Sequence, residues 1–166
     1  APTAITGSAQ VLGDGVSECS VTEITQETLL LLSTIVFFVA AIRHPESRGF
    51  LVLVGGFFAT MLIRELDCLF DMVRHGAWAY PAIVAAATSI AIAAANHRTV
   101  LEPMVSYLGS KSWIYLTIGL LIVLVLSRLF GSGQLIWNTV MGRDYRTEYR
   151  AIIQEGLELF GYIFIF

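Results

Sequence analysis

The fold is decided by the most apolar stretch of the chain, LTIGLLIVLVL at residues 116–126, which contains no charged residue. This stretch lies within an apolar segment, residues 112–130, which is followed by the helix-breaking sequence Gly131-Ser132-Gly133. A helix needs about 20 mostly apolar residues to cross the hydrocarbon core of a bilayer, because each residue advances the helix by about 1.5 Å. The segment therefore predicts a transmembrane helix.

Four further segments have the same character. They cover residues 21–42, 48–74, 78–96 and 149–166. Together the five segments predict an all-α protein, a polytopic transmembrane helix bundle of about five membrane helices. Residues 1–20 are rich in Gly, Ser and Thr and are expected to form an irregular N-terminal tail, so that the single transmembrane helical domain covers residues 21–166.

The composition agrees with a chain surrounded by lipid. Apolar residues make up 56% of the sequence and charged residues 14%, and the mean hydropathy is +0.73. A soluble domain usually carries about 25% charged residues, so the charges here are too few to cover a water-exposed surface. The net charge of −3 also excludes a nucleic-acid partner, which requires a basic patch.

Small and helix-breaking residues predict how the helices end and pack. Pro45 is expected to end the first helix, and Gly55-Gly56 to let the second bend or approach a neighbour closely. The third helix is dominated by alanine, which favours a central place in the bundle because small side chains let helices pack closely in lipid. Residues 99–111 are expected to connect helices, and residues 134–148 to form an interfacial loop or short surface helix.

Because successive helices cross the membrane in alternating directions, the N-terminal tail lies on the same side as two connections. These are the one between the second and third predicted helices and the one between the fourth and fifth. That side, including the ends of its helices, has six Lys and Arg residues, and the other side has four. This small difference is weak evidence for which side is cytoplasmic. The tail has no basic residue, so the N-terminus is expected outside, in a membrane of the bacterial inner-membrane type. Cys19 and Cys68 then lie near an oxidising face and are candidates for a disulfide.

The two ends of the sequence leave alternatives open. The start shows no signal peptide, which fits either loss of an initiator Met or earlier cleavage of a signal peptide. The last residues, Tyr162-Ile163-Phe164-Ile165-Phe166, have no polar flank. They indicate either that the sequence continues or that this helix ends inside a partner.

Ionisable residues gather in the second and fifth predicted helices. The first group is Arg64, Glu65, Asp67, Asp71 and His75, and the second is Glu155 and Glu158. At 100° per residue, Arg64, Asp71 and His75 fall near one line with Thr60 and Cys68, whereas Glu65 points elsewhere. Because charges in lipid cost several kcal/mol unless they are paired, these residues are expected to face inward, with Arg64 pairing with Glu155 or Glu158.

Three interpretations of this cluster stay open. It is a structural salt-bridge network, a polar cavity that binds an ion, a proton or a small ligand, or a metal site. The metal-ligand candidates are Asp67, Asp71, His75, Glu155 and Glu158. No His-Glu-x-x-His or Cys-x-x-Cys motif is present, and a single histidine makes a poor zinc site.

No motif assigns a catalytic residue or a cofactor. The small size, the short connections and the apolar C-terminal residues favour a non-catalytic accessory or structural subunit of a larger membrane complex. Its partners would be the lipid bilayer and other membrane-protein subunits. The alternative is an ion-, proton- or metal-binding membrane protein, either a transporter or an intramembrane metal-dependent enzyme, that uses the acidic cluster.

Overall fold

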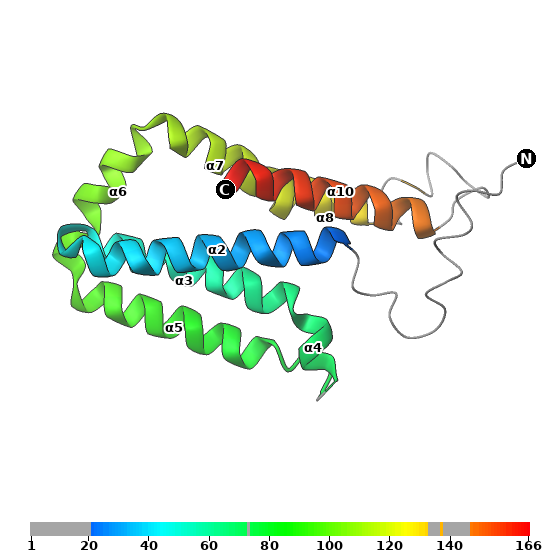
Figure 1. Cartoon of the computed structure of the whole chain (residues 1–166), viewed down its shortest axis with the longest axis horizontal. Coiled ribbons are helices and arrows are strands. Elements are labelled where there is room, and N and C mark those ends of the chain that lie inside the picture. The colour runs from blue at the N-terminus through cyan, green and yellow to red at the C-terminus, as the bar shows by residue number, and fades with distance from the viewer. Residues whose placement is uncertain (1–20, 73, 133–136, 138–146) are drawn as a thin grey trace, which may run out of the picture.

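The computed structural model of the chain describes residues 21–72, 74–132, 137 and 147–166 (Figure 1). For residues 21, 68, 71 and 147–151 it describes the backbone alone. The described part is helical and contains no strand, which confirms the predicted all-α class. The predicted N-terminal tail and most of the predicted interfacial segment 134–148 lie outside the described residues.

The first two helices form an antiparallel hairpin. Helix α2, Val21–Arg43, and helix α3, Arg48–Glu65, are joined by the short helix η1, Pro45–Ser47. Pro45 is the first residue of η1, as expected for a residue that cannot continue the preceding helix. The two helices pack side by side along most of their length (Figure 1).

Two glycines let α3 lie between two neighbours. A Cβ atom at Gly55 would lie 3.3 Å from the Cβ atom of Phe37 on α2. A Cβ atom at Gly56 would overlap the side chain of Ser89 on helix α5, Ala79–Ala95. The predicted close approach at Gly55-Gly56 is therefore confirmed, with one glycine facing each neighbouring helix.

Helix α3 ends earlier than the sequence predicted. The expected single helix over residues 48–74 is wrong, because the backbone turns at Leu66 and continues as the five-residue helix α4, Asp67–Asp71. The apolar run of α3 ends at Ile63, so packing no longer holds the following residues on the α3 axis. Asp67 is exposed as a result.

Helix α5 lies at the edge of the bundle, not at its centre (Figure 1). Its buried residues Ala82, Ser89 and Ala93 face α3, and α3 separates it from α2. The predicted central position is wrong because only one face of α5 meets another described helix. The opposite face is exposed and carries alanines together with large side chains such as Ile83 and Ile90.

A sharp bend follows α5. The short helix η2, His97–Thr99, leads into helix α6, Leu101–Leu108, and the axis turns by 95° between Ala79–Ala95 and His97–Leu108. The Oγ1 atom of Thr99 accepts a hydrogen bond from the Gly49 amide at 2.8 Å and donates to the Asn96 carbonyl at 2.8 Å. The segment predicted as a plain connection is therefore mostly helical and is fixed to the start of α3.

The most apolar segment forms α7, Lys111–Leu121, the π-helical turn η3, Ile122–Leu126, and α8, Ser127–Gly131. Helix α10, Thr147–Ile165, runs back along it. A Cβ atom at Gly119 would lie 2.7 Å from the Gly161 carbonyl oxygen, and one at Gly161 would lie 2.9 Å from the Gly119 carbonyl oxygen. The two glycines therefore bring the backbones of α7 and α10 into contact.

The core lies where α2, α3, η3 and α10 meet. It consists of the buried side chains of Leu30, Phe58, Met61, Val123 and Tyr162. These residues come from both antiparallel pairs, α2 with α3 and α7–α8 with α10. The core therefore joins the two pairs into one bundle.

The described helices identify the chain as an integral membrane protein. Three of them are long and apolar enough to span a membrane, namely Thr22–Arg43, Pro45–Glu65 and Lys111–Gly131. The bent pair Ala79–Ala95 and His97–Leu108 makes a fourth if it counts as one span. Helix α10 carries Glu148, Arg150, Glu155 and Glu158 within its 19 residues, whereas each of the three spans contains an 18-residue stretch with at most two charged residues.

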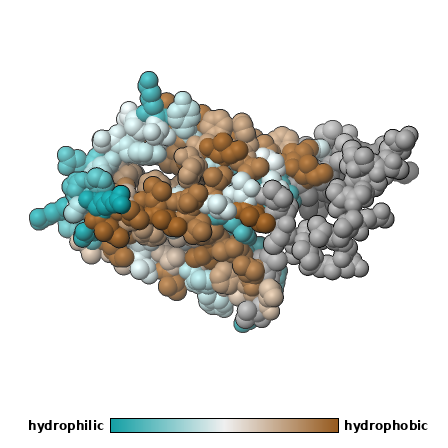
Figure 2. All heavy atoms as spheres, in the orientation of Figure 1, coloured by the Kyte–Doolittle hydropathy of each residue, from teal (hydrophilic) through white to brown (hydrophobic). Residues whose placement is uncertain are grey.

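The surface has the character that lipid contact requires. Large apolar side chains are exposed on several helices, for example Val36 on α2, Ile83 on α5 and Ile114 on α7. Figure 2 shows broad hydrophobic areas over the body of the molecule and hydrophilic residues at the end where η1 and η2 lie. A soluble monomer rarely exposes so much continuous apolar surface.

Candidate functional site

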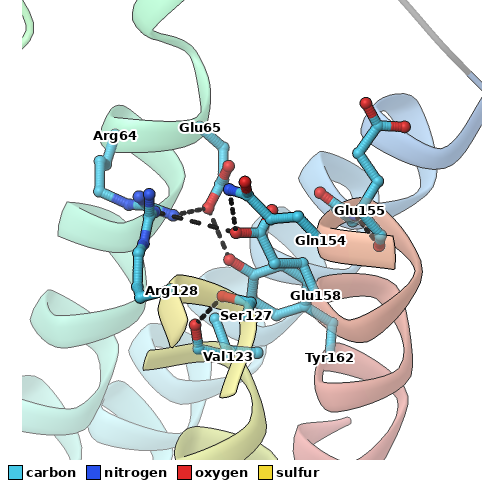
Figure 3. Close-up of polar contacts among 10 residues, drawn as sticks. Arg64, Glu65, Val123, Ser127, Arg128, Gln154, Glu155, Glu158 and Tyr162 are labelled. Carbon is cyan, nitrogen blue, oxygen red and sulfur yellow. Dashed lines mark hydrogen bonds and ion pairs between the residues drawn. The ribbon is translucent and has the colours of Figure 1, made fainter. Parts of the chain in front are cut away.

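A cluster of polar side chains lies between α3, α8 and α10 (Figure 3). We call it the polar cluster and define it by six residues: Arg64, Glu65, Arg128, Gln154, Glu158 and Tyr162. It borders the core, because the ring of Tyr162 packs with the core residues while its hydroxyl group points into the cluster. Aromatic residues with a polar tip are suited to such a boundary.

Glu65 joins α3 to α10. The Tyr162 hydroxyl donates a hydrogen bond to Oε1 of Glu65 at 2.7 Å. The same oxygen accepts a hydrogen bond from Nη2 of Arg64, which also forms an ion pair with it. Because Tyr162 is only 1% exposed, this is a largely buried polar link between two helices that are distant in sequence.

Glu158 joins α10 to α8. Its Oε1 atom lies 3.9 Å from Nη2 of Arg128 and accepts a hydrogen bond from Nε2 of Gln154 at 3.3 Å. Glu158 is 6% exposed, whereas the Arg128 side chain is 49% exposed. The contact with Arg128 is therefore long and partly solvated, and it is weaker than the link at Glu65.

The cluster is electrically balanced, since two arginines accompany two glutamates. Burying a charge without a partner costs several kcal/mol, and a nearby opposite charge offsets much of this cost. Both carboxylates have one arginine and one neutral donor within reach. As arranged, the cluster is able to hold helices together without a bound ion.

The π-helical turn η3 sets the direction of Arg128. A π turn adds one residue to the helix, which rotates the following residues by about 100° relative to an uninterrupted α-helix. Ser127, directly after this turn, is fully buried, and its hydroxyl donates to the Val123 carbonyl. The rotation directs Arg128 toward Glu158 (Figure 3).

Two further contacts position the start of α10. A Cβ atom at Gly131 would overlap the side chain of Gln154, so this glycine makes room for the amide that donates to Glu158. The Nε2 atom of Gln26 on α2 donates to the Glu155 carbonyl at 3.1 Å, and Gln26 is buried. The starts of α2 and α10 therefore lie together, which agrees with their predicted position on the same side.

Arg64, Glu65 and Glu158 are the predicted residues that the structure brings together. The expected pairing of Arg64 with Glu155 or Glu158 is wrong, because the arginine pairs with its sequence neighbour Glu65. The expectation that Glu65 points elsewhere is also wrong. Glu65 continues the buried stripe of Phe58 and Met61 at helical spacing, and this stripe faces α10.

The other predicted residues lie away from the polar cluster or outside the description. Asp67 is exposed beyond the break in α3, and His75 is exposed beyond α4. The backbone of Glu155 receives the Gln26 contact, and its carboxylate points away from the cluster in Figure 3. The side chain of Asp71 and the proposed Cys19–Cys68 disulfide lie outside the described residues.

The metal interpretation gains no support from the described side chains. Among them, no group of three or more His, Cys, Asp or Glu residues is placed to hold a metal ion. The candidate ligands His75 and Glu158 lie on different segments: His75 is exposed beyond α4, and Glu158 is buried on α10. The acids that are buried have arginine partners instead.

Sequence reasoning missed Arg128, Gln154 and Ser127. Arg128 lies near the end of the most apolar segment, where a basic residue is expected to face the membrane surface. Its inward direction depends on the π-helical turn, which no sequence pattern predicted. The spacing of Gln154 and Glu158, four residues apart on one helix, was the available sign that the two side chains meet.

The sequence matches no protein-family model, and no curated protein and no solved structure was found that matches it.

Proposed function

We propose that the chain is a non-catalytic accessory subunit of a larger membrane assembly. In this proposal the polar cluster holds α3, α8 and α10 together, and the outer face of α5 packs against a helix of another subunit. The coarser statement, that the chain is an integral membrane protein, follows from its apolar helices.

The outer face of α5 carries this proposal. Ala87, Ala91 and Ala95 follow one another at intervals of four residues and are all exposed, on the side opposite the buried Ala82 and Ser89. Helices in lipid associate through small residues at such spacing, because these let two backbones approach closely. A lipid-facing surface has no such requirement for alanine, so the pattern favours a helix as the neighbour.

The polar cluster supports a structural role. Its two carboxylates are each engaged by an arginine and a neutral donor. A catalytic or transport site usually leaves a polar group facing a cavity. The cavity of about 170 Å³ that involves the middle of α3 is lined by Gly56, Ser89 and their neighbours, and by no ionisable residue.

The test replaces one alanine of the outer face by a large residue. Ala91→Phe is expected to release the chain from its assembly, whereas Val36→Phe, which changes an exposed position on α2, is expected to leave it bound. The readout is the mass of the tagged chain after extraction from its native membrane in mild detergent. A wild-type chain that runs at the monomer mass of 18.2 kDa, or an Ala91→Phe variant that stays bound, contradicts the proposal.

The alternative function, binding of a proton or cation, is favoured by one observation. Glu158 is buried, yet its arginine partner lies 3.9 Å away and is half exposed. Such a carboxylate is able to exchange its partner for a proton or a cation. The test measures flux of protons or cations into vesicles that contain the purified chain. Flux that is abolished by Glu158→Gln and kept in Gln154→Glu supports this alternative. Absence of flux in the wild type contradicts it, and bound metal in stoichiometric amount favours its metal version.

The proposed orientation places the N-terminus outside in a bacterial-type inner membrane. Helix alternation places the starts of α2 and α10 on one side and η1 and η2 on the other. The absence of Lys and Arg from residues 1–20 favours the outside for the first side. An impermeant thiol reagent is expected to label Cys19 and Cys68 in whole cells only after reduction. Labelling without reduction contradicts the disulfide, and labelling only after lysis contradicts the orientation.

A further inference from the structure

A cavity of about 170 Å³ lies between α3 and α5, which run side by side (Figure 1). Small residues create it, because Gly56 on α3 and Ala86 on α5 leave space that larger side chains would fill. Phe57 and Ile90 also line the cavity and are 40% and 60% exposed. Since both of these apolar side chains reach the outer surface of the bundle, the cavity opens toward lipid, and a molecule dissolved in the bilayer is able to enter it.

The Ser89 side chain lines the cavity, and its hydroxyl group has no hydrogen-bond partner among the described residues. Ser89 is only 7% exposed, so bulk solvent does not satisfy this hydroxyl. On the α3 side it lies against Gly56, where a Cβ atom would overlap it, and glycine has no side chain that accepts a hydrogen bond. A buried donor without a partner costs free energy, which a bound molecule with an accepting atom recovers.

The other buried serines among the described residues are satisfied within their own helices. Ser33 donates to the Leu29 carbonyl at 2.9 Å, and Ser127 donates to the Val123 carbonyl. In both cases the acceptor is four residues earlier, which is a common bond for serine inside a helix. Ser89 departs from this pattern, so its hydroxyl is left available for a group inside the cavity.

The chemistry of the lining selects the kind of occupant. A buried water molecule usually makes about three hydrogen bonds. Among the lining residues only Ser89 and Thr60 carry hydroxyl groups, and the Thr60 hydroxyl already donates to the Phe57 carbonyl at 2.7 Å. Water is therefore poorly held, and an acyl chain would fill the volume but leave the Ser89 donor unsatisfied. A molecule with an apolar body and one accepting oxygen meets both requirements.

The size of the cavity favours a single ring. An apolar protein cavity of about 150 Å³ is able to bind benzene. The cavity between α3 and α5 has about 170 Å³, which leaves room for one such ring with an oxygen substituent. The Phe57 side chain in its wall offers an aromatic surface for contact with this ring.

From these features we infer that the cavity between α3 and α5 binds a lipid-soluble ring compound whose oxygen accepts a hydrogen bond from Ser89. The ring fills the space beside Gly56 and Ala86, and the compound enters from the bilayer. The exposed alanines of the outer face of α5, Ala87, Ala91 and Ala95, do not line the cavity. The inference is therefore independent of the proposed function.

The experiment measures binding of two fluorinated ring compounds to the full chain in mild detergent by fluorine NMR. The probes are para-fluorophenol and para-fluorotoluene, which have nearly the same shape and differ by a hydroxyl in place of a methyl group. Wild type is expected to bind both in a saturable manner. Ser89→Ala is expected to bind para-fluorophenol about fivefold less tightly, because one neutral hydrogen bond is lost, and to bind para-fluorotoluene as wild type does. Each probe is compared between wild type and variant at one detergent concentration, so that its partition into micelles cancels.

Two control variants separate the hydroxyl from the space around it. Ser33→Ala removes a buried hydroxyl that is bonded within α2 and lies outside the cavity lining, and it is expected to leave binding of both probes unchanged. Ala86→Leu fills the cavity and is expected to abolish binding of both. Absence of saturable binding of para-fluorophenol to wild type overturns the proposal, as do an equal loss of both probes in Ser89→Ala and wild-type binding in Ala86→Leu.

Thermal stability without any probe gives a second measurement. The Ser89 hydroxyl has no bond to lose, and alanine is the better helix former, so Ser89→Ala is expected to melt no lower than wild type. A lower melting temperature shows that the hydroxyl is bonded within the chain and also overturns the proposal. Since saturable binding is measured on the wild type, the proposal is testable even if Ala86→Leu fails to fold.

Discussion

Replacing Tyr162 by Phe removes one oxygen from the polar cluster and leaves the aromatic ring in the core. The ring packs among Leu30, Phe58 and Val123, and a phenylalanine ring fills the same space. Among the described residues, the hydrogen bond lost from this side chain is the 2.7 Å contact with Glu65. The variant therefore isolates the polar link between α3 and α10 from the packing of the core.

The expected loss of stability is about 1.5 kcal/mol. A hydrogen bond to a charged group contributes about 1.5–3 kcal/mol in water-soluble proteins, whereas hydrogen bonds between membrane helices average about 0.6 kcal/mol and reach about 1.7 kcal/mol. The upper part of the membrane range applies, because the acceptor is a carboxylate and Tyr162 is almost fully buried. Tyr162→Ala also removes the ring and is expected to cost about 3–5 kcal/mol.

The assay is reversible unfolding in mixed detergent micelles, followed by circular dichroism. Tyr115→Phe, which removes a hydroxyl from an exposed ring, is the control and is expected to change the free energy of unfolding by less than about 0.5 kcal/mol. A double-mutant cycle with Glu65→Gln measures the coupling between the two side chains. If Tyr162→Phe and Tyr115→Phe are equally stable, or the cycle shows no coupling, Tyr162 does not bind Glu65.

Two further predictions concern charge and backbone contact. Arg64→Ala leaves the largely buried Glu65 carboxylate without its cation and is expected to lower the free energy of unfolding by about 3 kcal/mol. Arg98→Ala changes an exposed residue and is expected to alter this free energy by less than about 0.5 kcal/mol. Similar melting temperatures for the two variants would contradict the pairing of Arg64 with Glu65. Gly161→Ala places a methyl group 2.9 Å from the opposing carbonyl oxygen of α7 and is expected to cost about 1–3 kcal/mol. Gly156→Ala, with no atom within 4 Å of the new methyl group, is expected to be neutral or stabilising, and equal losses in the two glycine variants would show that α7 and α10 do not touch.

Apolar length predicted the membrane helices because lipid imposes it directly on the sequence. The stretches in α2, α3 and α7–α8 are long and apolar enough to span, whatever the helices pack against. The arrangement of the helices depends on which faces pack against each other, and the alanines of α5 are distributed over both its buried and its exposed face. Alanine content therefore predicted close packing for α5 but could not predict that only one of its faces meets another of the described helices.

The candidate site was predicted in part for a related reason. Arg64 and Glu158 were expected to face inward because lipid excludes charge, and the structure places both in the polar cluster. The predicted stripe Thr60–Arg64–Cys68 assumed a straight helix and grouped polar residues with one another. The buried stripe runs through Phe58, Met61 and Glu65 instead, so a carboxylate that follows apolar residues at helical spacing was the better guide.

The π-helical turn at Ile122–Leu126 makes the number of residues in this helix matter as much as their identity. Deleting any one of these aliphatic residues shortens the span by only about 1.5 Å, a change that a bilayer accommodates. The same deletion would restore a regular α-helix and swing Arg128 by about 100° around the axis. The guanidinium would then leave Glu158 and face the acyl chains. A change that preserves hydropathy almost completely would thereby remove the ion pair that joins α8 to α10.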